Sequence, residues 1–187
     1  MRTLKEWFQQ GLTKQAYAEQ MNVNQEELFK IYNDLTIDEA THQALTELQG
    51  KGIQVVVLTA DWCGDAMVNV PILMKFADLA LIEVRYLNRD ENLELMDQYL
   101  TNGRARSIPI FVFMNKDGKE IGKWGPRAAF VEQKITELKE GLPEKDTDGY
   151  EEAFKVDFLP KARTLFQDES IRTEIQADLL EVMKRLT

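Results

Sequence analysis

The apolar residues of this chain follow two different periods, which together predict alternating strands and helices. Residues 53–60 (IQVVVLTA) are β-branched and apolar on both faces, as is typical of a central strand covered by helices on each side. Further strands are predicted at 81–89, 108–115 and 119–125, and helices at 66–80, 90–100 and 126–140. The first two strands should be parallel, since a helix joins them, and the turn at 116–118 should make the last two an antiparallel hairpin.

Helical patterns also precede and follow this region. Helices are predicted at 3–21, 24–35 and 36–50, with N-cap spacing in the pairs Thr3/Glu6, Asn24/Glu27 and Thr36/Glu39. The predicted helix at 126–140 should begin at Pro126, where the missing backbone N–H leaves no hydrogen bond unmade.

Beyond a polar linker at 141–149, two amphipathic segments remain. The last carries an apolar stripe at helical spacing: Ile171, Ile175, Leu179, Met183 and Leu186. The stripe should pack on the domain as ordinary core or, alternatively, on a second copy of the chain as a homodimer. We expect an N-terminal helical extension (1–35), a domain (36–141) and a C-terminal helical extension packed on that domain (142–187).

Composition narrows the chemistry. The net charge of −9 opposes binding to nucleic acid, because affinity for phosphates comes from Lys and Arg. No apolar run is long enough for a membrane span, and the first residues lack the apolar core of a signal peptide, so we expect a soluble cytoplasmic protein. With one cysteine, Cys63, and one histidine, His42, an intramolecular disulfide is excluded and neither a zinc site nor another cofactor is expected.

The sequence around the cysteine resembles the thioredoxin superfamily. Trp62-Cys63-Gly64 follows the first strand, as in the Trp-Cys-Gly-Pro-Cys motif, and Ile108-Pro109 opens the third strand, where the family has a cis-proline. Pro71 also falls where the family has a helix-kinking proline, and Lys116-Asp117-Gly118 is similar to its hairpin turn. The resemblance covers roughly residues 38–140.

This resemblance implies an α/β thioredoxin-like fold, with a central mixed sheet of about four strands flanked by helices and extra helices at both termini. It also implies a catalytic role for Cys63. The residues expected to bind substrate beside the thiol are Trp62, Gly64, Asp65, Ile108 and Pro109. Because Cys63 should lie where a strand ends and a helix begins, free backbone N–H groups and the helix dipole favour its thiolate.

Three positions depart from the family pattern. Ala66 replaces the resolving cysteine, Asp65 replaces the proline of the motif, and Val57 stands where thioredoxins usually bury an aspartate. A dithiol mechanism is therefore excluded, because the second thiol is the one that releases a mixed disulfide. An external thiol must take over that step.

Neighbouring charges should set the reactivity of Cys63. Asp65 and Asp61 disfavour a thiolate, and Arg106 is the cation expected to compensate. We therefore expect the thiol pKa to be lowered only modestly or not at all. Two functions remain open: thiol–disulfide exchange with protein or low-molecular-weight thiols through one cysteine, and a non-catalytic module that retains the peptide-docking groove of the fold.

Overall fold

The computed structural model describes residues 2–187, so the first residue of the predicted N-terminal extension lies outside it. Its centre is a four-stranded mixed sheet in the order β2-β1-β3-β4. The strands are β1 (Gln54–Thr59), β2 (Glu83–Asn88), β3 (Ile110–Met114) and β4 (Glu120–Trp124). β1 pairs with β2 in parallel and with β3 in antiparallel orientation, and β3 pairs with β4 as an antiparallel hairpin. The predicted thioredoxin-like fold class is confirmed.

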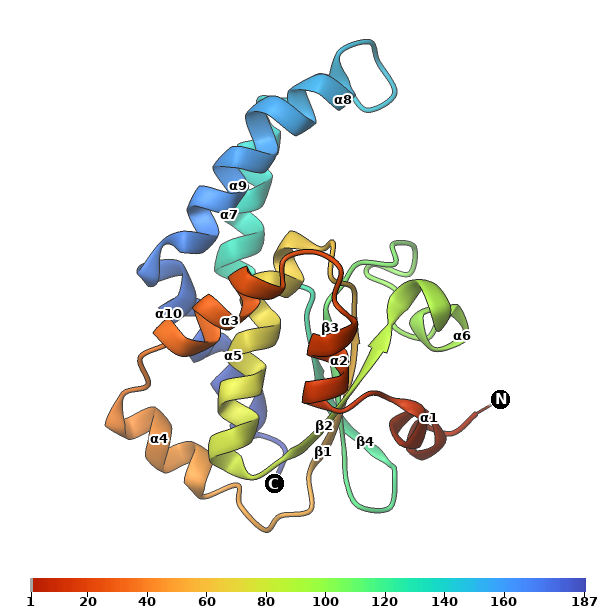
Figure 1. Cartoon of the computed structure of the whole chain (residues 1–187), viewed down its shortest axis with the longest axis vertical. Helices are drawn as coiled ribbons and strands as arrows, with labels where there is room; N and C mark the ends of the chain where they lie inside the picture. The colour runs from red at the N-terminus through yellow and green to blue at the C-terminus, as the bar shows by residue number, and fades with distance from the viewer. Residues whose placement is uncertain (1) are drawn as a thin grey trace.

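The central position of β1 follows from its sequence. Val55, Val56, Val57 and Leu58 are fully buried, because helices cover both faces of the strand. In the register of the sheet, Val57 lies between Tyr86 of β2 and Phe111 of β3. The strand thus ends, at Thr59, in the middle of the upper edge of the sheet (Figure 1).

The sheet is surrounded by helices. Their bounds are α1 (Leu4–Gln10), α2 (Lys14–Gln20), α3 (Gln25–Asp34), α4 (Glu39–Thr46), α5 (Gly64–Ala80), α6 (Leu93–Met96), α7 (Ala129–Lys139), α8 (Tyr150–Ala153), α9 (Leu159–Gln167) and α10 (Glu169–Lys184). α5 contacts α3, α4, α9 and α10 as well as β2, which explains why it is apolar on nearly all sides.

The predicted helix at 3–21 is wrong, because it is divided into α1 and α2. Leu12, between them, forms an antiparallel bridge with Tyr86 on the outer edge of β2, with N–H···O distances of 2.8 and 2.9 Å. A side chain on Gly11 would meet Arg85 at 2.6 Å, so the chain can approach the strand only without one. The hydrogen bonds gained by pairing the open edge of β2 therefore stabilise the chain more than a continuous helix would.

Two of the three predicted caps differ from the structure. Thr3 and Glu6 form the expected capping box. Asn24 makes no side-chain cap bond; its amide donates instead to the backbone oxygen of Asp61. α4 begins after Asp38, whose carboxylate accepts from the N–H of Thr41, and not after Thr36.

Two predicted helices are shorter than expected. The segment 90–100 contains a 3-10 turn (Arg89–Glu91) and the single turn of α6. α7 begins at Ala129, so Pro126 lies before the helix and not at its first position. The Gly125–Pro126 bond is cis, and the carbonyl of Pro126 accepts a hydrogen bond from the Asn69 side chain of α5 at 3.0 Å. This loop brings Arg127 toward the start of α5.

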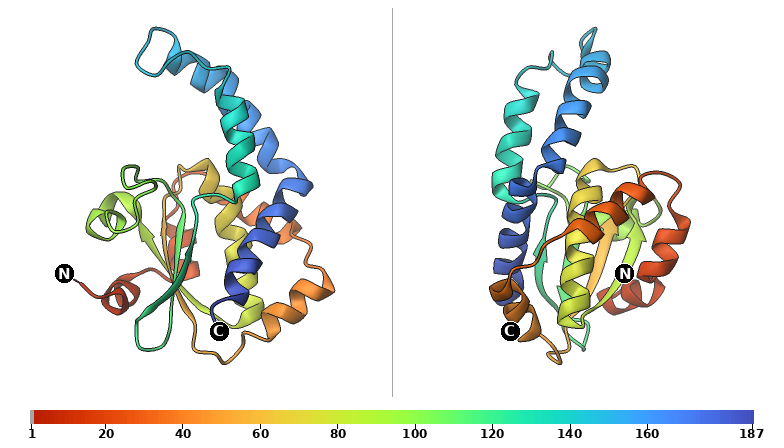
Figure 2. Two further views of the ribbon diagram at one scale, coloured as in Figure 1. Left: turned by 180° about the vertical axis from the view of Figure 1, so that it is seen from behind. Right: turned by 60° about the vertical axis from the view of Figure 1, so that its left-hand side comes forward.

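The C-terminal part of the chain forms a projecting helical arm and a returning helix. α7 rises from the domain, and α8, a π-helical segment (Phe154–Phe158) and α9 descend beside it (Figures 1 and 2). α10 then packs against α5 and β4, where Asp178 accepts a hydrogen bond from the indole of Trp124 at 2.6 Å. Of the predicted stripe, Ile171, Ile175, Leu179 and Met183 are buried within the chain, and Leu186 is partly buried against the same core.

Candidate functional site around Cys63

Cys63 occupies the N-cap position of α5, four residues after the end of β1. At this position its sulfur lies beside the start of the helix, and the backbone groups of Ala66 and Asp65 favour its thiolate. On the other side, the thiol donates to the backbone oxygen of Ile108 at 3.5 Å. The Ile108–Pro109 bond is cis. The fold thus brings the predicted residues Cys63, Asp65, Ala66 and Ile108 together around one sulfur atom.

The thiol is less acidic than the sequence suggested. Burial raises the pKa of Cys63 to about 11, and the negative charge of Asp65 adds to this rise. The N–H groups of Ala66 and Asp65 and the charge of Arg127 lower the pKa, but by less. The expectation of a slightly lowered or unchanged pKa was therefore wrong in direction. Its physical reason is burial, since only 9% of Cys63 is exposed.

Asp65 forms a two-pronged ion pair with Arg127. Both hydrogen bonds are 2.7 Å long, and the side chains are only 14% and 17% exposed. Arg127 also contacts Glu132 at 2.6 Å. Burial raises the pKa of Asp65, while the hydrogen bonds and charge of Arg127 oppose that rise. The pair fixes the first turn of α5 directly beneath the thiol.

The compensating cation is Arg127 and not Arg106. Arg106 is exposed, and its guanidinium binds Asp97 at 2.7 and 3.0 Å. Arg127 was not among the predicted site residues, because a helix beginning at Pro126 would place it in an ordinary first turn. The signal was present in Gly125-Pro126, a pair typical of loops, directly before the arginine.

Trp62 lies on the surface beside the site. Its side chain is 51% exposed, its indole N–H donates to Asp90 at 3.2 Å, and the guanidinium of Arg89 lies 4.7 Å from its ring centre. These contacts hold the ring in place while leaving one face open. Trp62 is thus positioned as an exposed aromatic neighbour of a buried thiol.

The side chains of Asp61 and Ala66 contact other parts of the fold. The Asp61 carboxylate accepts from the N–H groups of Asn22 and Val23, at 2.7 and 3.3 Å, and so ties the segment before α3 to the site. Asp61 does not contribute to the Cys63 pKa shift described above. Ala66 is fully buried, and its methyl group occupies the position of the absent second thiol.

A cavity of about 370 Å³ opens beside Cys63, which we call the Cys63 cavity. Its floor is the first turn of α5, and its walls are α7, α9 and the π-helical segment. The apolar part of the wall consists of Met67, Ile135, Phe154, Phe158, Leu159, Ala162 and Phe166. The arm therefore encloses a space that begins at the sulfur.

The thioredoxin family model matches residues 11–139 of this chain. The chain belongs to the thioredoxin family. The matched residues include α2, α3 and α4 as well as the sheet, and membership of the family supports a role in thiol–disulfide chemistry in general. No curated protein matches the chain.

Solved structures of similar fold extend over the whole chain. A protein of unknown function from Pseudomonas aeruginosa is 17% identical, with 98% of each chain covered and a TM-score of 0.67. An HIV epitope scaffold is 14% identical over 98% of each chain, with a TM-score of 0.68. Thioredoxin from Fasciola hepatica is 26% identical, but the match covers 51% of this chain and 88% of that one, with a TM-score of 0.33. The first two likenesses show that the fold includes the helices at both ends.

Two further structural findings concern residues 2–187. No helix in this range is both long and apolar enough to cross a membrane. Within the same range, no three His, Cys, Asp or Glu side chains are grouped so that they could hold a metal ion.

Proposed function

We propose that this thioredoxin-family protein carries out thiol–disulfide exchange through Cys63 alone, with the resulting mixed disulfide resolved by an external thiol. The observation that carries the proposal is the position of the sulfur at the N-cap of α5, where the thiol donates to the carbonyl oxygen of Ile108 at 3.5 Å. The start of α5 partly offsets the burial that disfavours a negative sulfur, and Cys63 lines the Cys63 cavity.

The first half-reaction uses the Cys63 thiolate as nucleophile. Its sulfur forms a bond with one sulfur of a disulfide, and the other sulfur leaves with the electron pair of the broken S–S bond and takes up a proton. In the second half-reaction, the thiolate of another molecule attacks the mixed disulfide, and Cys63 leaves as the thiolate. Ala66 cannot take part in either step.

Only the thiolate reacts, so burial of Cys63 limits the rate. With a pKa of about 11, about one thiol in ten thousand is ionised at pH 7. Arg127 keeps this fraction from being smaller, because its charge lies close enough to lower the thiol pKa. We propose that Arg127 positions Asp65 and the first turn of α5 and does not itself contact the substrate.

The same burial favours a second candidate, a module that binds a partner without chemistry. A thiol that is 9% exposed, with Phe166 placed so that it would touch a side chain on Gly64 at 3.8 Å, resembles a covered site. Exchange and binding differ in one outcome, because only exchange leaves a covalent adduct on Cys63.

The test is intact-mass measurement after incubation with oxidised glutathione across pH 7–10, followed by addition of a reduced thiol. Exchange predicts one glutathione adduct per chain, formed faster at higher pH and removed by the reduced thiol. Cys63→Ser should give no adduct, because the chain has no other cysteine. A folded wild-type protein that forms no adduct at pH 10 would exclude exchange and leave the binding module.

A further inference from the structure

The Cys63 cavity has an apolar interior built mainly by the arm. Phe154, Phe158 and Phe166 contribute aromatic faces, and Phe154 stacks on Phe158 with ring centres 4.9 Å apart. Phe154 and Phe158 are the two ends of the π-helical segment. Such segments are rare and often mark functional sites. The feature that interrupts regular helix in the arm therefore lies on the wall of the cavity.

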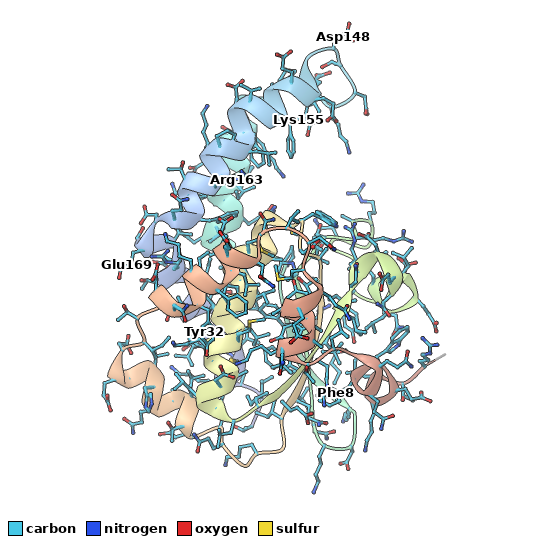
Figure 3. The ribbon with its side chains drawn as sticks, in the orientation of Figure 1. Phe8, Tyr32, Asp148, Lys155, Arg163 and Glu169 are labelled. Carbon is cyan, nitrogen blue, oxygen red and sulfur yellow. The ribbon has the colours of Figure 1, made fainter. Side chains whose placement is uncertain are left out.

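Two cations lie on the wall of the cavity away from the thiol, although the whole chain carries a net charge of −9. Beside the thiol, Arg127 pairs with both Asp65 and Glu132. Of the other charged lining residues, Lys139 and Arg163 are cations and Glu27 is the single anion. Arg163 is exposed and lies midway along the arm, between Lys155 and Glu169 (Figure 3). An anion with an apolar body complements these surroundings.

The size and cover of the cavity favour a small molecule over a protein chain. A volume of about 370 Å³ is near the lower end of the range of about 300–1,000 Å³ usual for small-molecule sites. Ile108, one of the residues expected to bind substrate, is buried, and its backbone oxygen already accepts a hydrogen bond from the thiol of Cys63.

We propose that the Cys63 cavity binds a low-molecular-weight thiol that has an aliphatic body and one carboxylate, and that this molecule is the external thiol that resolves the mixed disulfide. The role of this molecule as the resolving thiol rests on the proposed function. The aliphatic body lies among the phenylalanines of the arm, and the carboxylate lies near Arg163 and Lys139. The incoming thiolate bonds to the partner sulfur as the bond between that sulfur and Cys63 breaks. Cys63 receives the electron pair and then the proton that the incoming thiol lost.

Binding is tested without any thiol chemistry by titrating octanoate into Cys63→Ser in a calorimeter. We expect saturable binding of one octanoate per chain, no binding of acetate, and much weaker binding of octylamine. Arg163→Glu should weaken octanoate binding about tenfold or more. The matched control is Lys161→Glu, an exposed residue of α9 outside the cavity, which should leave the affinity unchanged. Ala162→Phe, which fills the cavity, should also abolish binding.

The outcomes separate this inference from the proposed function. Absence of octanoate binding, or equal affinity in the Arg163→Glu and Lys161→Glu proteins, overturns the anion site whether or not Cys63 forms adducts. If octanoate binds as expected, 8-mercaptooctanoate should release glutathione from Cys63 about tenfold faster than 2-mercaptoethanol at equal concentration. Equal release rates overturn its role as the resolving thiol. If no glutathione adduct ever forms, the proposed function fails, while the octanoate titration still decides the binding site.

Discussion

Replacement of Asp65 by asparagine should make Cys63 more reactive. Asn keeps the shape of the side chain and one hydrogen-bond acceptor for Arg127, but it removes the negative charge that is the second cause of the raised thiol pKa. The charge of Arg127, which lowers the pKa, remains and then faces only Glu132. Both changes favour the thiolate, so the sign of the effect is determined by the geometry.

The causes of the raised Cys63 pKa limit how far the pKa can fall in Asp65→Asn. The rise from 9.0 to about 11 corresponds to about a hundredfold loss of thiolate. Burial is the larger cause, and the substitution leaves it in place. We therefore expect the pKa to fall by about one unit, which gives about tenfold faster alkylation at pH 8. The variant should be less stable by about 1–3 kcal/mol, because a buried arginine loses a charged partner.

The assay is the rate of iodoacetamide alkylation, followed by intact mass from pH 7 to 10 on protein whose circular dichroism shows it to be folded. For the wild type, the rate should rise about tenfold per pH unit without a plateau, because the thiol titrates only near pH 11. Glu132→Gln is the matched control: it removes the other carboxylate of Arg127 and should change the rate less than about twofold. Equal rates for Asp65→Asn and the wild type, or a wild-type plateau near pH 8.5, would refute this account of the site.

Three other predictions concern named positions. Ala66→Cys should form a disulfide with Cys63 after mild oxidation, because Cys63 is the N-cap of α5 and residue 66 lies in its first turn. Ala80→Cys, at the other end of α5, should keep two thiols that are both alkylated once the protein is unfolded. Gly125→Ala should lower the free energy of unfolding by about 2 kcal/mol or more in urea titrations, because the φ of Gly125 is +116° and a Cβ there would overlap the Pro109 carbonyl. Gly141→Ala, where a Cβ would meet open space, should change it by less than about 0.5 kcal/mol. Asp178→Ala should lower the free energy of unfolding by about 1–3 kcal/mol, because the buried indole N–H of Trp124 loses its acceptor. Glu174→Ala, at an exposed position of the same helix, should lower it by less than about 0.5 kcal/mol in the same titrations.

The central position of β1, its parallel pairing with β2 and the β3–β4 hairpin could be predicted from the sequence, because residue period and turn length carry that information. The run that forms β1 is apolar on both faces, which favours a central strand, and the short turn at 116–118 favours a hairpin. The division of the first helix could not be predicted in the same way. It depends on Leu12 pairing with Tyr86, a contact between residues 74 positions apart that no local pattern records.

The candidate site was predictable in its covalent motif but not in its electrostatics. Trp62-Cys63-Gly64 and Ile108-Pro109 identified the residues that surround the sulfur, since both are short motifs with local structural meaning. The cation could not be found by distance along the chain, because Arg127 is 62 residues from Asp65 and reaches it through the loop before α7. The degree of burial also depends on the arm, whose course over Cys63 is a tertiary property.

The arm and the absence of a second thiol together restrict how a resolving thiol can reach Cys63. In a dithiol site, the resolving sulfur is part of the chain and needs no access path. Here Ala66 is buried and inert, so a resolving thiol must reach Cys63 from outside, yet the first turn of α5 lies beside α9 and Phe166. The Cys63 cavity is an access path that reaches the sulfur, and its walls belong to helices that follow the matched family region of residues 11–139, apart from α7. If the proposed exchange occurs, the arm therefore selects the resolving thiol by size, apolar surface and charge, a selectivity that the motif around Cys63 cannot provide.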